Sequence, residues 1–143
     1  MTHIVCSHCG ATNRIGPEQD ARAGKCGKCS RLLFDGQPAD VSGALFEKQI
    51  AKSGIPVVVD IWAPWCGPCR VMGPQFMAAA QASEPDMRFI KLNSDENQEV
   101  SARLGIRGIP TMILFKGGQE VARVSGAMAS ADIIRWVRAK AEA

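Results

Sequence analysis

The chain has 143 residues, of which 46% are hydrophobic and 22% charged, and its formal net charge is +3 at pH 7. This composition predicts one ordinary domain with a small addition, and so small a charge gives no support for nucleic acid or an acidic membrane surface as a partner. No stretch reaches the roughly 18 apolar residues of a membrane span, and the first residues lack a basic region followed by an apolar run, so we expect no membrane segment and no secretory signal.

The first 36 residues differ from the rest, because they carry four cysteines and few large apolar side chains. A segment this short usually needs a metal, disulfides or a partner in order to fold. Two Cys-x-x-Cys pairs separated by 16 residues have the spacing of a four-cysteine zinc ribbon. We therefore expect one structural zinc ion, with these ligands: Cys6, Cys9, Cys26 and Cys29. Two local disulfides or four idle thiols are the alternatives, and His3 and His8 are expected at the surface.

The same segment shows only a weak nucleic-acid footprint. Five basic side chains stand against three acidic ones, and Phe34 is the only aromatic residue. Solvated charge explains this balance better than a binding surface does, so no nucleic-acid partner is expected.

After a linker at residues 35–40, Ser42 is placed to cap a helix over residues 43–53. Residues 57–63 form a nearly continuous apolar run, which predicts a strand covered on both faces. Asp60 lies in the middle of this run, where a carboxylate is costly unless it is neutral, paired or functional. Its place six residues before Cys66 favours a functional role.

A third Cys-x-x-Cys pair, Cys66 and Cys69, stands between this strand and a predicted helix that continues to about residue 83 with Pro74 inside it. The amide groups and dipole of a helix N-terminus favour a thiolate, which makes such a pair suitable for thiol–disulfide exchange. Cys66 is the expected nucleophile and Cys69, within the first turn, the expected resolving thiol. Asp60 would take the proton of Cys69 as a general base.

The remaining pattern alternates strands and helices. It predicts strands at 87–93 and 112–115, a helix at 96–104, a turn at 116–119 leading to a strand at 120–124, and a last helix at 130–141. These elements form an α/β fold with a mixed central sheet flanked by helices.

Residues 40–143 resemble the thioredoxin family, because residues 65–69 match its Trp-Cys-Gly-Pro-Cys motif and residues 109–111 match its cis-proline loop. With the amino-terminal cysteines, the chain resembles the zinc-containing bacterial thioredoxin 2 type. The resemblance implies a thioredoxin fold at residues 37–143, preceded by a small zinc ribbon at residues 1–36.

The resemblance also implies roles for further residues. Gly67 and Pro68 would set the stiffness of the redox loop, and Lys91 would tune Asp60 electrostatically. A flat apolar surface for extended substrates would be formed by Trp65, Ile109, Pro110 and Gly126.

We therefore expect a cytoplasmic, monomeric thiol–disulfide oxidoreductase that reduces disulfides in client proteins and is recycled by thioredoxin reductase and NADPH. It would bind zinc but no organic cofactor. The alternative is a redox-regulated zinc-binding holdase or interaction module, in which oxidation of the amino-terminal cysteines releases the metal. A disulfide-forming oxidant is disfavoured by the Gly67-Pro68 dipeptide and by the lack of an export signal.

Overall fold

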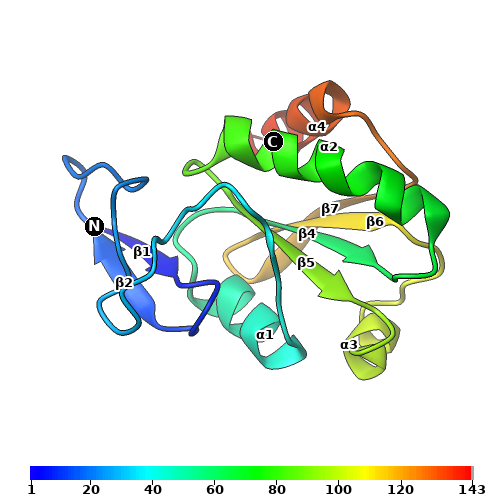
Figure 1. The fold of residues 1–143 in the computed structure, drawn as a ribbon, viewed down its shortest axis with the longest axis horizontal. Helices are drawn as coiled ribbons and strands as arrows, with labels where there is room; N and C mark the ends of the chain where they lie inside the picture. Colours follow the sequence, from blue (N-terminus) through cyan, green and yellow to red (C-terminus); the bar gives the residue numbers. More distant parts are fainter. Residues whose placement is uncertain (143) are drawn as a thin grey trace.

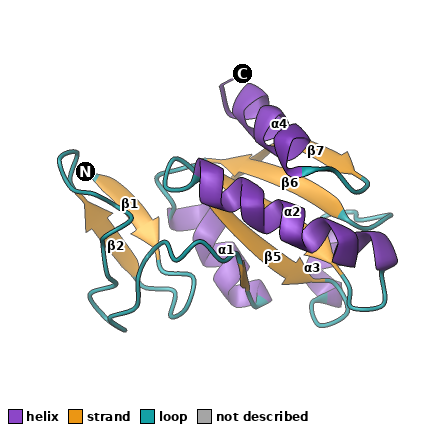
Figure 2. Ribbon diagram, turned by 45° about the horizontal axis from the view of Figure 1, so that its top comes forward, coloured by secondary structure: helices purple, strands orange, loops and turns teal. Residues whose placement is uncertain are grey.

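The computed structural model describes residues 1–142. A five-stranded sheet in the order β3-β5-β4-β6-β7 forms the centre, with α2 and α4 on one face and α1 and α3 on the other (Figure 1). A two-stranded sheet, β1-β2, lies at one end of the molecule (Figure 2). The elements are β1 Thr2–Val5, β2 Thr12–Ile15, β3 Ala39–Asp40, α1 Gly43–Lys52, β4 Val57–Trp62, α2 Gly67–Ser83, β5 Arg88–Asn93, α3 Gln98–Arg103, β6 Thr111–Lys116, β7 Gln119–Ser125 and α4 Ser130–Glu142.

Strand β4 occupies the middle of the sheet, parallel to β5 and antiparallel to β6. Its side chains alternate between two cores, so that Val58 packs with α2 and α4 whereas Val59 and Ile61 pack with α1. Because both faces are covered, the strand reads as an unbroken apolar run in the sequence. The predicted mixed sheet flanked by helices is confirmed.

Most predicted elements appear within a few residues of their expected bounds. Ser42 caps α1, and its side chain accepts a hydrogen bond from the Leu45 amide at 3.1 Å. The turn between β6 and β7 is shorter than predicted, because only Gly117 and Gly118 lie between the strands, both at positive φ. The Ile109–Pro110 bond is cis, as the family resemblance implied, and Glu84–Pro85 is also cis.

Two strand pairings were not predicted. The amino-terminal segment forms the β1-β2 hairpin, and the linker contributes β3, which pairs with β5 in parallel. These strands have only two to four residues and no apolar alternation that would reveal them in a sequence.

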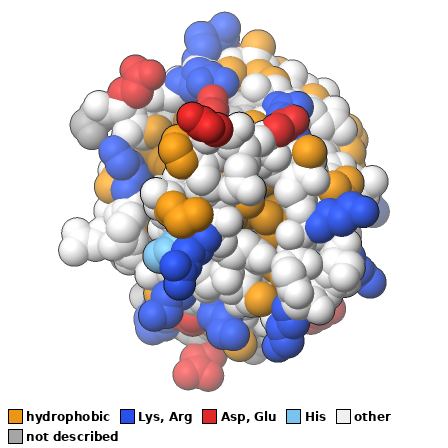
Figure 3. Space-filling model, turned by 90° about the vertical axis from the view of Figure 1, so that its left-hand side faces the viewer, with side chains coloured by type: hydrophobic (Ala, Val, Ile, Leu, Met, Phe, Trp, Pro, Cys, Tyr) orange, Lys and Arg blue, Asp and Glu red, His pale blue; other side chains and the backbone are white. Residues whose placement is uncertain are grey.

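The amino-terminal segment has its own small core, which consists of Ile4, Cys6, Cys26, Leu33 and Phe34. The end of the molecule that carries this segment shows basic and acidic side chains, with hydrophobic side chains between them (Figure 3). Within residues 1–142, no helix is long and apolar enough to cross a membrane.

One buried arginine joins this segment to the main sheet. The Arg88 side chain, on β5, donates to the Val5 carbonyl at 3.0 Å, and its guanidinium lies 4.2 Å from the centre of the Phe34 ring. It also lies 3.8 Å from the carboxylate of Glu84, which in turn accepts a bond from the Phe89 amide. The Arg88 and Glu84 side chains are both buried, so the opposite charge of each offsets the cost of removing the other from water.

We expect Arg88→Met to lower the free energy of unfolding by about 3 kcal/mol, since it leaves the Glu84 carboxylate buried without a cation and the Val5 carbonyl with one donor fewer. Urea unfolding at pH 8 measures this loss. The control is Arg138→Met, which removes an arginine 3.9 Å from Asp86 at the surface and should cost less than about 1 kcal/mol. Equal losses in the two variants would show that Arg88 is not an anchor.

Candidate functional site

Cys66 and Cys69 lie at the N-terminus of α2 with their sulfur atoms at disulfide distance and their Cα atoms 5.2 Å apart. Cys66 is the N-cap residue, and its sulfur accepts a hydrogen bond from the Cys69 amide at 3.2 Å. Pro68 occupies the first turn, where a missing amide hydrogen leaves no helical bond unmade. Negative charge on the Cys66 sulfur is thus favoured by both the amide and the helix dipole.

The two sulfurs are packed among Trp62, Ala63 and Ile109. The Cys66 sulfur lies 3.8 Å from the Ile109 carbonyl oxygen. The residues are 4% and 3% exposed, so accessibility does not distinguish Cys66 from Cys69, although we expected Cys69 to be more shielded. The distinction comes instead from the position of Cys66 at the helix end.

The residues expected to contact substrate lie around this pair. Trp65 is 69% exposed, and its indole donates to Asp95 at 3.2 Å. The Gly126 amide donates to the Pro110 carbonyl at 2.9 Å, which places β7 beside the cis-proline loop. Gly126 has a φ of +104°, a conformation that other residues rarely adopt.

Trp65 and Ile109 also line a groove of about 510 Å³ that continues toward α3. Sequence reasoning missed the far side of this groove, which is formed by Ser94, Gln98, Ser101, Ala102, Ile106, Arg107 and Gly108. Their pattern is that of an ordinary short helix and loop, and only the fold brings them into one groove with Trp65 and Ile109.

Asp60 is fully buried in β4, and neither carboxylate oxygen has a hydrogen-bond partner among the described residues. Burial raises its pKa to about 7, while Lys91 opposes this rise and Asp40 adds to it. Lys91 is the direct neighbour of Asp60 on β5. Its ammonium lies 4.4 Å from the centre of the Trp62 ring, so this lysine is half-buried rather than free in solvent.

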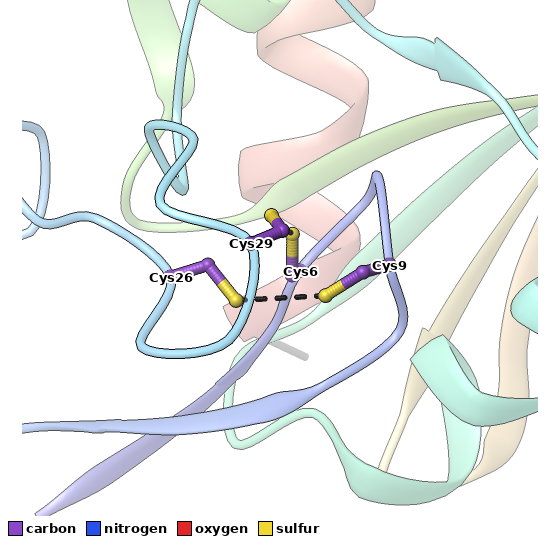
Figure 4. A group of neighbouring side chains, drawn as sticks. All are labelled: Cys6, Cys9, Cys26 and Cys29. Carbon is purple, nitrogen blue, oxygen red and sulfur yellow. Dashed lines mark hydrogen bonds between the residues drawn. The ribbon is translucent and has the colours of Figure 1, made fainter.

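The four amino-terminal cysteines form a second cluster, in which all sulfur atoms lie within 4.8 Å of one another (Figure 4). Two sulfur contacts join residues of different pairs: 3.7 Å for Cys6 to Cys29 and 3.5 Å for Cys9 to Cys26. None of the four is in a disulfide. Two separate turns therefore present their thiols to one point, as a tetrahedral metal site requires.

Local amides prepare this cluster for negative charge. Backbone hydrogen bonding in the turn of Cys29, helped by the Asn13 side chain, lowers the pKa of Cys26 to about 6. The ring of His8 is engaged elsewhere, with Asp35 at 3.4 Å from one nitrogen and Arg31 at 3.3 Å from the other. The donor set is thus four thiols without a histidine, a set suited to zinc.

Comparison with known proteins agrees with this geometry. A family model described as Thioredoxin matches residues 37–139. "Thioredoxin C-3" of Corynebacterium nephridii is 38% identical over 134 residues, which cover 94% of this chain and 92% of that protein. "Thioredoxin 1" of Nostoc sp. is 47% identical over 90 residues, covering 63% of this chain and 84% of that protein.

Solved structures give the same result. A mutant thioredoxin from Halobacterium salinarum NRC-1 superposes with a TM-score of 0.66 at 26% identity, covering 76% of this chain and 94% of that one. A Malassezia sympodialis thioredoxin superposes with a TM-score of 0.65 at 31% identity, covering 73% and 90%.

The raised pKa of Asp60 predicts how stability depends on pH. Its folded pKa of about 7 exceeds the ordinary 3.8, so the neutral carboxyl favours folding below about pH 4, and this advantage is lost as the pH rises through 7. Asp60→Asn cannot ionise. Its stability relative to the natural chain should therefore increase by about 4 kcal/mol between pH 4 and pH 9.

Urea unfolding of the disulfide form at both pH values measures this difference. Asp132→Asn is the control, because Asp132 is an exposed helical residue beside Arg135, and its substitution should show little change between the two pH values. A pH-independent effect of Asp60→Asn would contradict the prediction.

Proposed function

The chain belongs to the thioredoxin family of thiol–disulfide oxidoreductases, and we propose that it reduces disulfides in client proteins through Cys66 and Cys69. The observation that carries the proposal is the bond from the Cys69 amide to the Cys66 sulfur, at the start of a helix and within reach of a second thiol. An open groove lined by Trp65 and by Ile109, whose carbonyl oxygen lies 3.8 Å from the Cys66 sulfur, gives an extended chain a place to bind.

The reaction has two exchange steps. The Cys66 thiolate attacks one sulfur of the client disulfide, forms a mixed disulfide and releases the other client sulfur as a thiolate. Cys69, once deprotonated, attacks the Cys66 sulfur and expels the second client thiolate. The client gains two electrons, and the Cys66–Cys69 pair is left as a disulfide.

Asp60 acts as the general base that takes the proton of Cys69, directly or through water. A base with a pKa of about 7 is suited to this step, because it can both accept and release a proton near neutral pH. Lys91, on the neighbouring strand, lowers the affinity of Asp60 for its proton. Gly67 and Pro68 separate the two cysteines by a short, stiff stretch of chain, which holds their Cα atoms 5.2 Å apart.

The substrate surface consists of Trp65, Ile109, Pro110 and Gly126. Trp65 offers an exposed ring beside Cys66, and the cis-proline loop offers backbone groups to an extended client segment. Recycling would need an external two-electron donor, for which we propose a thioredoxin reductase with NADPH. A cytoplasmic location and a monomeric state stay predictions from the sequence.

Residues 1–36 form a zinc ribbon in this proposal, and residues 37–143 form the redox domain. Cys6, Cys9, Cys26 and Cys29 would hold one zinc ion. Four thiolates close the coordination shell, so the metal would stabilise the fold and leave no position for a substrate. The small core of the segment explains why it needs such support.

Substitution of Cys66 and substitution of Cys69 should have different effects on the reaction. Cys66→Ser should abolish catalytic reduction of a protein disulfide such as that of insulin, whereas Cys69→Ser should accumulate a mixed disulfide with the client. Turnover by NADPH with thioredoxin reductase measures the first effect, and intact-protein mass spectrometry measures the second. Catalytic turnover by Cys66→Ser would overturn the proposed function.

The metal site predicts one zinc ion per chain. We expect Cys29→Ser to lose most of this zinc and His8→Ala to retain it, as measured by elemental analysis of the purified chains. Chelation should also remove hydrogen-exchange protection from residues 1–36 while the main sheet stays protected. Equal zinc content in the two variants would contradict the four-thiolate site.

The same zinc assay tests the holdase alternative. Zinc release by peroxide, at doses that leave the main sheet folded, would favour a redox-regulated module. Retention of zinc until the whole chain unfolds would favour a structural metal.

A further inference from the structure

Three charged residues lie side by side on adjacent strands behind the redox pair. Asp40 on β3 is the register partner of Lys91 on β5, and Lys91 is in turn the partner of Asp60 on β4. Register partners project from the same face of a sheet. The lysine is therefore flanked by a carboxylate on each side, one fully buried and one exposed.

Trp62 connects this row to the sulfur atoms. It follows Asp60 by two residues on β4, so it projects from the same face, and it packs in the cluster that contains both cysteines. Its indole nitrogen donates to Asp40 at 3.2 Å, and its ring lies 4.4 Å from the Lys91 ammonium. One indole thus contacts both the exposed carboxylate and the shared cation.

We propose that Asp40 is a positioning residue for Asp60, which fixes the Trp62 indole against Lys91 and divides the charge of Lys91 between two carboxylates. This inference rests on the proposed role of Asp60 as the base. The Asp40 side chain accepts the Trp62 indole bond, and we place its effect on Asp60 in this contact, in Lys91 and in its own charge.

The surroundings of Asp60 contain few other charges. Lys91 and Asp40 are the charged groups that influence its carboxyl. Its partner on β6 is Met112, which carries no charge, and Trp62, two residues along β4, packs with Cys66 and Cys69, which do not titrate in the disulfide form. Lys91 also borders an open groove of about 390 Å³ beside Pro38 and Pro74.

Removing the Asp40 charge has two effects of the same sign. The repulsion that raises the pKa of Asp60 disappears, and Lys91 is left with a single carboxylate to neutralise. Both changes favour the ionised form of Asp60. In the natural chain, Asp40 therefore keeps the proton affinity of Asp60 near neutral pH, where proton exchange with Cys69 is most effective.

The test is a carbon-13 NMR titration of the Asp60 carboxyl in the disulfide form at low salt, with the signal assigned by its loss in Asp60→Asn. Asp40→Asn keeps an oxygen that can accept the indole bond and removes only the charge. We expect the Asp60 midpoint to fall by about 0.5 pH unit. An unchanged or raised midpoint would overturn the proposal.

Asp95→Asn is the matched control, since Asp95 also accepts a tryptophan indole bond at 3.2 Å but has no place in this row of strands. Its substitution should leave the Asp60 midpoint unchanged. A shift equal to that of Asp40→Asn would mean that general surface charge is the cause, and the proposal would fail.

A second comparison tests whether Asp40 acts through the cation. Lys91→Gln should raise the Asp60 midpoint, and Asp40→Asn in that background should lower it by only about half as much as in the natural chain. Equal shifts in the two backgrounds would show direct repulsion alone and overturn the sharing of Lys91.

The failure of this inference can be told apart from the failure of the proposed base. If Asp60→Asn leaves the pH profile of client reduction unchanged, then Asp60 is not the base, whatever its titration shows. If Asp60→Asn changes that profile but Asp40→Asn leaves both profile and titration unchanged, the base is supported and the role of Asp40 is excluded.

Discussion

The hydrogen bond from the Cys69 amide to the Cys66 sulfur depends on how the chain turns from β4 into α2. Strand β4 is buried on both faces at the centre of the sheet, so its end has little freedom. Packing of Ala63 with both cysteines continues that rigidity into the turn. The helix N-terminus therefore lies at the sulfur before any substrate arrives, and the stabilisation of a thiolate needs no rearrangement.

The same burial that makes β4 rigid sets the chemistry of Asp60. A carboxylate without hydrogen-bond partners in a fully buried strand is held partly neutral, and this opposes stability above neutral pH. A purely structural residue here would be apolar, as its neighbours Val59 and Ile61 are. The fold thus carries a destabilising group on the strand that leads into the redox pair, and the proton-transfer role that we propose for Asp60 would account for it.

Local patterns were sufficient to predict the main fold and the two cysteine clusters. The spacing of Cys66 and Cys69, the apolar run around Asp60 and the paired amino-terminal cysteines all lie within short stretches of sequence. The contacts that the sequence did not reveal join distant segments. Arg88 bonds to Val5 across 83 residues, and nothing near either residue marks the other as a partner. β3 has only two residues, so its pairing with β5 has no periodicity to detect.

Strand β3, at one edge of the sheet, connects the amino-terminal segment to the row of charged residues that continues to β4. Phe34, against which Arg88 packs, is followed within a few residues by Asp40, which accepts the Trp62 indole bond. Arg88 and Lys91 stand on the same strand, β5, only three residues apart. One contact of β5 therefore anchors the cysteine-rich segment, and another reaches the residues behind the catalytic pair. β3 pairs with β5 at Ile90 and Lys91, shortly after Arg88, so the two contacts lie along one short stretch of β5.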